Sequence, residues 1–217
     1  MAFTATRTVL FLLGAPGSGK STQGARLHRQ YSWPHFCVGD WLRKRAALAG
    51  AADGTADDVL VAEVLRGGER IVPSRITMTI MQQVLRVEWN ELASVAIVDG
   101  FPRNVENATA LQEAGMSVLG AQRAAYLWLH LPEAEALRRL AGRRRADDVD
   151  EAARRRWQTY YRKTLPLQEY LRRERLRPVD ASGTEAQVAA RITQALHELE
   201  LLPPPVVADG HASERGR

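Results

Sequence analysis

Short runs of apolar residues recur along the chain and are separated by longer segments. The first, Thr8–Leu13, is almost continuously apolar, which is typical of a strand buried on both faces. Similar runs follow at Val95–Val98 and Ala125–Leu129, and a weaker one, Arg177–Val179, precedes Asp180. The pattern therefore predicts buried strands of a parallel sheet.

The segments between these runs have the patterning of helices. We expect helices over about 20–30, 57–66, 74–88, 104–114, 133–143, 149–174 and 184–201. Alternating strands and helices predict an α/β fold, a doubly wound parallel sheet with helices on both faces. Residues 1–201 are expected to form a single domain, and 202–217, which begin with a Pro-rich stretch, a disordered tail.

Composition narrows the class of protein. The 217 residues are 45% hydrophobic, and 30 basic against 25 acidic residues give a net charge of +5. The 40 residues from Arg138 to Arg177 alone hold 13 arginines and one lysine against six acidic residues, or +8. The positive charge therefore belongs to one segment, and a surface for binding nucleic acid is not indicated.

Cysteine usage and the apolar runs exclude further classes. Cys37 is the only cysteine, so an intrachain disulfide and a Cys-rich zinc site are both excluded, and we expect its side chain to be buried. No apolar run approaches the roughly 20 residues of a membrane span, and the Leu10–Leu13 run is too short for a signal peptide. We expect a cytoplasmic protein that binds no membrane and acts as a monomer.

A phosphate-binding motif follows the first apolar run. Residues 14–21 read Gly-Ala-Pro-Gly-Ser-Gly-Lys-Ser and match G-x-x-x-x-G-K-[ST] between a buried strand and a helix. Glycines let backbone N–H groups converge on phosphate oxygens, and the helix N-terminus adds partial positive charge. Lys20 is expected to span the β- and γ-phosphates of ATP, while a hydroxyl of Ser21 or Thr22 orients Mg²⁺. The expected ATP-binding residues here are Gly14, Pro16, Gly17, Ser18, Gly19, Lys20, Ser21 and Thr22.

Two further motifs follow in order along the chain. They are Val38-Gly39-Asp40-Trp41-Leu42-Arg43 and Asp99-Gly100-Phe101-Pro102-Arg103. With the phosphate loop, they resemble the adenylate kinase family of nucleoside monophosphate (NMP) kinases over about Val9 to Leu196. The resemblance implies a P-loop kinase fold with a small NMP-binding flap at about 40–72, a very short lid at about 143–150, and ATP with Mg²⁺ as phosphate donor.

The same resemblance supplies candidate residues for the acceptor nucleotide. Arginine suits an acceptor phosphate because it is always charged and forms two parallel hydrogen bonds. Arg43, near the start of a helix, and Arg103 match the family's acceptor-phosphate arginines, and Asp99 is implied to lie near Mg²⁺ through water. The other residues implied to bind the acceptor in this part of the chain are Val38, Gly39, Asp40, Arg70, Val72, Gly100 and Asn107.

Asn107 bears on the identity of the acceptor base. Adenylate kinases usually have Gln four residues after the motif arginine, whereas UMP-CMP kinases have Asn in the pattern D-G-F-P-R-N-x-[DE]-N. Residues 99–107 here read Asp-Gly-Phe-Pro-Arg-Asn-Val-Glu-Asn, which favours CMP or UMP. The alternatives are an adenylate kinase in the strict sense, since an amide can read either base, and a helix-start Asn107 without base contact.

The arginine-rich segment resembles the family's lid. Arg145-Ala-Asp-Asp resembles Arg-x-Asp-Asp, Arg156 lies eleven residues later, and Arg143 resembles the arginine at the near hinge. Such cations stabilise the negative charge of the transition state, so Lys20, Arg103, Arg143, Arg145 and Arg156 are the expected catalytic residues. Arg143 is also implied to bind ATP, and Arg145 and Arg156 the acceptor. Only Arg144 separates Arg143 from Arg145, which leaves the register of these arginines open.

Two departures from the family pattern, one further resemblance and two rival functions complete the expectations. Ser21 stands where the family usually has Gly, so either Ser21 or Thr22 serves Mg²⁺. Val38 replaces a usual Thr or Ser. Gly183 resembles a position whose backbone meets the donor adenine, although a plain turn glycine is equally compatible. The rivals are a basic nucleic-acid-binding or scaffolding protein with a vestigial nucleotide site, and a kinase with a non-nucleotide acceptor.

Overall fold

The computed structural model describes residues 6–67, 71–90, 92–142 and 150–203. Its centre is a five-stranded, entirely parallel sheet with strand order β2-β3-β1-β4-β5. The strands are β1 (Thr8–Gly14), β2 (His35–Cys37), β3 (Val95–Asp99), β4 (Arg123–His130) and β5 (Leu176–Asp180). Four of them coincide with the predicted apolar runs, whereas β2 was not predicted because three residues are too few for a readable pattern.

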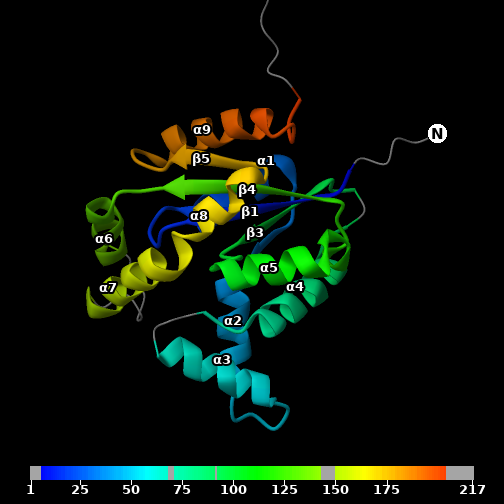
Figure 1. The fold of residues 1–217 in the computed structure, drawn as a ribbon, viewed down its shortest axis with the longest axis vertical. Helices are drawn as coiled ribbons and strands as arrows, with labels where there is room; N and C mark the ends of the chain where they lie inside the picture. Colours follow the sequence, from blue (N-terminus) through cyan, green and yellow to red (C-terminus); the bar gives the residue numbers. More distant parts are fainter. Residues whose placement is uncertain (1–5, 68–70, 91, 143–149, 204–217) are drawn as a thin grey trace, which may run out of the picture.

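Helices cover both faces of this sheet (Figure 1). The helices of the described residues are α1 (Lys20–Tyr31), α2 (Val38–Ala47), α3 (Ala56–Arg66), α4 (Ser74–Glu88), α5 (Val105–Ala114), α6 (Glu133–Ala141), α7 (Asp150–Thr159), α8 (Leu167–Tyr170) and α9 (Glu185–Glu198). Short 3-10 helices lie at Met116–Leu119 and Leu171–Arg173. The doubly wound α/β fold predicted from the sequence is confirmed.

Alternate residues of β1 point into two separate cores. Val9, Phe11 and Leu13 pack with α4, α5 and α8 on one face. Leu10 and Leu12 pack with α1 and α9 on the other. Because both faces of the central strand are fully buried, its sequence is continuously apolar instead of alternating.

The predicted single helix over 149–174 is wrong. The segment consists of α7, a π-helical turn at Tyr160–Thr164, α8 and a 3-10 turn. Pro166 carries no N–H and so cannot continue the hydrogen-bond ladder, while the Leu165 N–H reaches back five residues to the Tyr160 carbonyl at 2.8 Å. The π-turn widens the helix directly before this proline.

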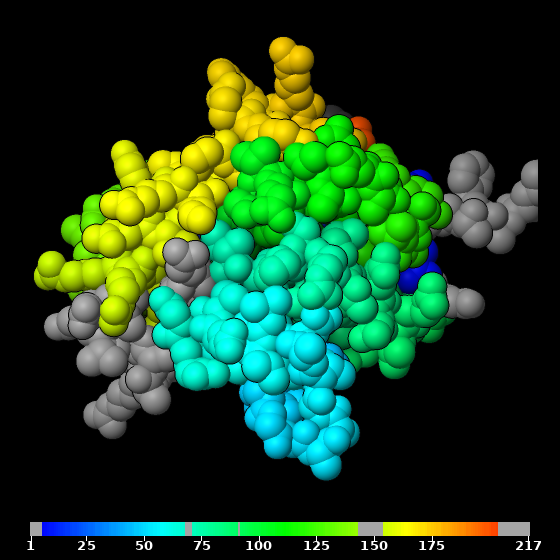
Figure 2. Space-filling model, turned by 60° about the horizontal axis from the view of Figure 1, so that its bottom comes forward, coloured from blue at the N-terminus to red at the C-terminus, as the bar shows by residue number. Residues whose placement is uncertain are grey.

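Two helices extend away from the sheet. α2 and α3 form a lobe at the bottom of Figure 1, and the loop between them stands out at the bottom of Figure 2. Arg45 of α2 and Asp58 of α3 form an ion pair in which Arg45 Nε lies 2.5 Å from Asp58 Oδ1. This pair links the two helices. The predicted tail beyond residue 203 lies outside the described residues.

Candidate active site

The phosphate loop joins β1 to α1 at the carboxyl edge of the sheet, where ligands of open α/β sheets bind. Gly17 and Gly19 have φ values of 85° and 88°, which L side chains rarely adopt. No side chain caps the N-terminus of α1, and its first turn contains no acidic residue. Its N–H groups and positive dipole end are therefore suited to an anion.

A cavity of about 160 Å³ lies against one side of this loop. It brings together eleven of the residues predicted from the sequence, from four separate stretches of the chain: Gly14, Pro16, Gly17, Lys20, Ser21, Gly39, Arg43, Asp99, Gly100, Arg103 and Arg156. Four cationic side chains thus line one hollow at the end of the sheet, which is the arrangement that clustered phosphates require.

Lys20 folds back over the phosphate loop. Its ammonium group donates hydrogen bonds to the carbonyls of Gly14 at 3.0 Å and Ala15 at 2.8 Å, and to the Ser18 hydroxyl at 3.4 Å. These bonds hold the ammonium group of Lys20 against the backbone of its own loop.

Asp99 ends β3 and is almost completely buried, with 2% of its surface exposed. In the sheet it is paired with Leu12 of β1 and Cys37 of β2. The hydroxyl of Ser21 donates a hydrogen bond to Asp99 Oδ2 over 2.5 Å. This bond connects the first turn of α1 to the adjacent strand end.

Cys37 lines the same cavity and is half-buried, so the expectation of a buried cysteine was only partly right. Its sulfur lies 3.9 Å from the Ser21 hydroxyl. Burial, with the nearby Asp99 carboxylate second, raises the pKa of the Cys37 thiol to about 11. The thiol is therefore neutral at physiological pH.

Arg43 lies on α2, in the middle of the helix and not near its start. It forms an ion pair with Asp40, one turn earlier, and 41% of its side chain is exposed. The backbone N–H of Arg103 donates a hydrogen bond to the Asn107 side-chain carbonyl at 3.1 Å, and this bond holds the Arg103 backbone in place. The two predicted acceptor-phosphate arginines thus approach the cavity from different elements.

Asn107 is buried, and both ends of its side-chain amide are hydrogen-bonded to the protein. Besides accepting from Arg103, its side-chain amide donates to the Ser74 hydroxyl at 2.9 Å, and its own N–H donates to the Asn104 side chain. It lines neither this cavity nor the one described below. The same is true of Val38, Asp40 and Val72, of which Val38 and Val72 are buried among apolar side chains.

A second cavity, of about 440 Å³, lies on the other side of the phosphate loop. Of the predicted ATP-binding residues, it is lined by Gly17, Ser18, Gly19, Thr22 and Gly183. Gly183 has a φ of 91° in the loop that connects β5 to α9. Helices α6 and α9 form the remaining walls.

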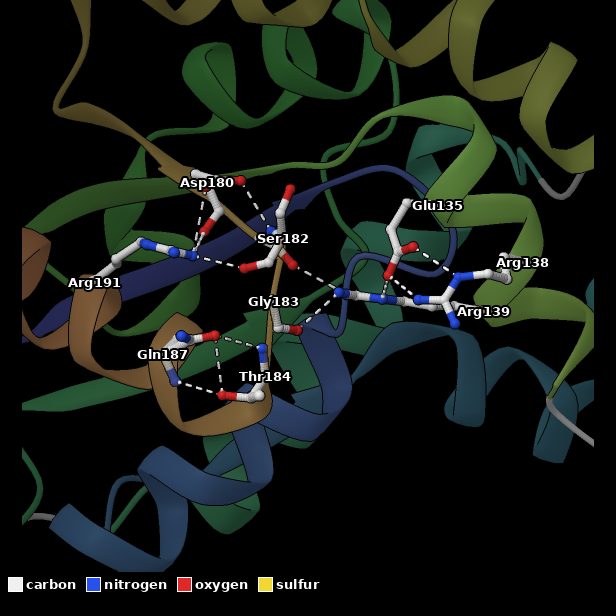
Figure 3. Close-up of polar contacts among 10 residues, drawn as sticks. Glu135, Arg138, Arg139, Asp180, Ser182, Gly183, Thr184, Gln187 and Arg191 are labelled. Carbon is white, nitrogen blue, oxygen red and sulfur yellow. Dashed lines mark hydrogen bonds and ion pairs between the residues drawn. The ribbon is translucent and has the colours of Figure 1, made fainter.

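Arg139 is a residue of this second cavity that sequence reasoning missed. Its guanidinium donates to the carbonyls of Ala181 at 3.0 Å and Gly183 at 3.1 Å and to Glu135 Oε1 at 2.7 Å (Figure 3). It therefore ties α6 to the loop after β5. Its spacing of four residues from Glu135 was the available signal, but that spacing also fits an ordinary surface ion pair.

Some of the predicted residues and features are not tested by the structure. Arg70, Arg143, Arg145 and the predicted lid lie outside the described residues, apart from the first residue of α7. Among the described residues, no three His, Cys, Asp or Glu side chains cluster to hold a metal, and no helix is long and apolar enough to cross a membrane. Tyr160 and Thr164, on the π-turn, line the first cavity beside Arg156 and were not among the predicted site residues.

The fold, with a phosphate loop between its first strand and first helix, is that of a P-loop kinase. A family model described as adenylate kinase matches residues 12–176. The chain is 37% identical over 185 residues to the adenylate kinase of Mycolicibacterium smegmatis, covering 85% of this chain and 97% of that protein. It is 36% identical over 187 residues to the adenylate kinase of Mycobacterium tuberculosis, covering 86% and 98%.

The chain belongs to the adenylate kinase family. It is therefore a phosphotransferase of the nucleoside monophosphate kinase class, and adenylate kinases use ATP as phosphate donor together with Mg²⁺.

Proposed function

We propose that this enzyme transfers the γ-phosphoryl group of ATP reversibly to AMP, with CMP and UMP as the alternative acceptors. The observation that carries the proposal is the first cavity, which the phosphate loop and Lys20 line together with Arg43, Arg103 and Arg156. A phosphate donor and a phosphate acceptor must meet in such a place, because two clusters of negative charge approach each other during the transfer.

Two observations favour AMP. The relatives that span nearly the same length are named adenylate kinase. The side chain on which the expectation of a pyrimidine acceptor rests, Asn107, is buried and has both ends of its amide engaged by Ser74 and Arg103. What supports the pyrimidine alternative is the Asn itself, in the sequence context of residues 99–107.

The proposed chemistry is an in-line displacement. An oxygen of the acceptor phosphate forms a bond to the γ-phosphorus, and the bond from that phosphorus to the β-bridging oxygen breaks, leaving its electron pair on ADP. A general base is unnecessary because the attacking oxygen already carries negative charge. Lys20 and the N–H groups of the loop hold the donor phosphates, Arg43 and Arg103 hold the acceptor phosphate, and Arg156 faces the space between them.

Mg²⁺ supplies neutralisation of the β- and γ-phosphate charge when it is bound with the nucleotide. Ser21 and Asp99 fit it by their chemistry, since a hydroxyl and a buried carboxylate are the oxygen donors that this ion prefers. We place the donor base in the second cavity, next to the backbone of Gly183 and the guanidinium of Arg139.

Closure is part of the proposal. Residues 40–72, which include the fastened pair α2 and α3, are proposed to act as the NMP-binding flap, and 143–150 as a short lid that carries Arg143 and Arg145. Closing both excludes water, which would otherwise accept the phosphoryl group. With a single cysteine and hence no intrachain disulfide, the chain suits a reducing compartment, and we propose a cytoplasmic monomer.

One coupled assay tests the function and the acceptor. Wild-type protein is supplied with ATP, Mg²⁺ and AMP, CMP, UMP or dCMP in turn, and kcat/KM is measured for each. AMP is expected to give the highest value, and Lys20→Ala to lower it by roughly 100-fold or more. A wild type that phosphorylates no monophosphate, or a Lys20→Ala variant with undiminished transfer, would refute the kinase assignment. A CMP or UMP value above that of AMP would establish the alternative acceptor.

Asn107→Gln separates two roles of this side chain. If Asn107 reads the base, the substitution shifts the ratio of the AMP to the CMP value of kcat/KM. If it only positions Arg103, as its hydrogen bonds indicate, all acceptors lose activity by a similar factor and the ratio stays constant.

A further inference from the structure

The hydroxyl of Ser74 connects two helices. Ser74 is the first residue of α4 and is buried, with 8% of its surface exposed. Serine is favoured at the start of a helix because its side chain can cap the free N–H groups there. The N-cap residue of α4, however, is Pro73, whose side chain has no polar atom for this purpose. The Ser74 hydroxyl instead contacts Asn107 and Glu106 in the first turn of α5.

The hydrogen bonds of this contact can run in only one direction. The backbone N–H of Arg103 can only donate, so the Asn107 side-chain atom that faces it, 3.1 Å away, is the carbonyl oxygen. The amide nitrogen of Asn107 therefore donates to the Ser74 hydroxyl oxygen at 2.9 Å. The hydroxyl hydrogen of Ser74 in turn goes to Glu106 Oε1 at 3.2 Å, because a carboxylate only accepts. Each donor along this chain thus points from Arg103 toward Glu106.

Ser74 is the acceptor that keeps the Asn107 amide in this orientation. Asn107 is 3% exposed, and its backbone is fixed separately, because its N–H donates to the Asn104 side chain that caps α5. Without the Ser74 oxygen, the side-chain NH₂ group of Asn107 becomes a buried donor that has lost its partner, which is costly. The amide relieves this cost by turning toward another acceptor, and the Arg103 N–H then loses the oxygen that holds it.

We propose that Ser74 is a positioning residue for the acceptor phosphate: it acts through Asn107 to hold the backbone of Arg103, which lines the first cavity. The proposal rests on the proposed function, in which Arg103 holds the acceptor phosphate. Ser74 lies two residues beyond the proposed flap, so the same bonds connect the end of the flap to this arginine. Because the effect reaches the phosphate and not the base, it is equal for all monophosphate acceptors.

Binding of the acceptor tests this role. The dissociation constant of AMP is measured by calorimetry for wild type and Ser74→Ala, both saturated with a non-hydrolysable ATP analogue so that only the acceptor site is free. Ser74→Ala is expected to raise this constant by roughly 10-fold and to leave that of the analogue unchanged. In steady-state assays the KM for AMP should rise while the KM for ATP does not, and the ratio of the AMP to the CMP value of kcat/KM should stay constant.

Thr77→Val is the matched control. Thr77 is also buried, near the start of α4, but its hydroxyl donates to the Pro73 carbonyl of the same helix start, at 3.2 Å. The substitution therefore removes a buried hydroxyl without touching the contact with α5, and it is expected to leave the affinity for AMP unchanged.

A double-mutant cycle identifies the route of the effect. If Ser74 acts through Asn107, the variant that combines Ser74→Ala with Asn107→Ala binds AMP no more weakly than Asn107→Ala alone. An AMP affinity that Ser74→Ala leaves unchanged would overturn the proposal. So would a loss that adds fully to that of Asn107→Ala, or an equal loss in Thr77→Val.

Thermal unfolding identifies a variant that does not fold, and Ser74→Gly, which also lacks the hydroxyl, then replaces Ser74→Ala. Failure of the proposed function is recognised separately. A wild type that binds AMP but transfers no phosphoryl group refutes the kinase assignment, while the comparison of AMP affinities remains valid. A wild type that binds no monophosphate overturns both proposals.

Discussion

Asp58 shows how one side chain holds the two flap helices together. As the third residue of α3 it accepts hydrogen bonds from the Thr55 N–H at 2.8 Å and the Thr55 hydroxyl at 2.7 Å, and Thr55 in turn accepts from the Asp58 N–H. Its second oxygen pairs with Arg45 of α2. Hydrogen bonds from Thr55, with Arg45 contributing less, lower the pKa of the Asp58 carboxyl below its ordinary value of 3.8.

Asp58→Asn is therefore expected to lower the free energy of unfolding by about 1–2 kcal/mol at pH 7, since it weakens a helix cap and removes the charge that pairs with Arg45. A carboxyl whose pKa is lowered by folding stabilises the folded state above the pKa of the unfolded chain. That stabilisation is lost as the pH falls through the folded-state pKa. The difference between variant and wild type should thus shrink below pH 3.8.

Urea unfolding at a series of pH values measures this effect. Asp57→Asn provides the neighbouring control, because Asp57 pairs with Arg75 at an exposed position, where solvent screens the attraction and the pair contributes little to stability. Equal losses in the two variants, or a difference that does not depend on pH, would contradict the role assigned to Asp58.

At the scale of elements, the phosphate loop is enclosed by β4 and α6. A Cβ atom at Gly14 would overlap the carbonyl oxygen of Leu129 in β4, and one at Gly17 would lie 2.8 Å from the carbonyl oxygen of Ala136 in α6. Both neighbours are backbone atoms and cannot rotate away. The close approach of three elements therefore fixes the path of the loop in addition to its own turn geometry.

Gly14→Ala is expected to reduce the free energy of unfolding by about 2–4 kcal/mol, since it adds overpacking to backbone strain. Gly50→Ala makes the same substitution at a φ of 87° with no atom within 4 Å of the new Cβ, and should lose only the strain, about 1–2 kcal/mol. Chemical unfolding of the two variants gives the comparison. A Gly14 variant that is no less stable than the Gly50 variant would show that β4 can move aside.

The elements that were predicted correctly from the sequence are those with long, regular patterns. β1 has five consecutive apolar residues between Thr8 and Gly14, and α4 carries its buried positions at helical spacing. β2 was missed because its three residues acquire their strand conformation only by pairing with β3. The break at residues 160–164 was missed because the pattern continues through the π-turn, and only Pro166 indicates it.

The residues of the candidate site were likewise predicted where they belong to a sequence motif and missed where they do not. Lys20, Arg43, Asp99 and Arg103 were found because each stands inside a motif. Arg139 was missed because its partners, the carbonyls of Ala181 and Gly183, are more than forty residues away and are backbone atoms that no sequence pattern marks. Ser21 and Thr22 line different cavities. This difference depends on how α1 is oriented relative to the two cavities, which the sequence does not show.

At the scale of the whole molecule, several of the arginines that contribute to the positive net charge form ion pairs with nearby acidic residues. Several arginines of the basic stretch from 138 to 177 pair with acidic residues that lie outside it or within it: Arg138 and Arg139 with Glu135, Arg172 with Glu169, Arg175 with Glu200, and Arg177 with Glu198. The described part of this stretch thus resembles a mixed ionic surface more than a continuous basic track.

Binding to long nucleic acid is accordingly expected to be weak. At 150 mM salt, the dissociation constant for a labelled duplex of about 20 base pairs should exceed roughly 10⁻⁴ M. Fluorescence anisotropy measures it, and a fluorescent ATP analogue in the same buffer serves as the positive control. Micromolar binding of the duplex with a steep dependence on salt would instead favour the nucleic-acid-binding alternative.

The internal partners of the cationic residues have one more consequence. Lys20 is bonded to carbonyls of its own loop and Arg43 to Asp40, so an incoming phosphate does not add to an empty site. The phosphate accepts hydrogen bonds from groups that already donate to protein atoms. When it binds, it therefore replaces the loop carbonyls at Lys20 and the Asp40 carboxylate at Arg43. A ligand must then offer these donors better acceptors than neutral carbonyls or a single carboxylate. Ions with one diffuse charge gain little from such an exchange, whereas phosphate groups with two charges gain at both cations.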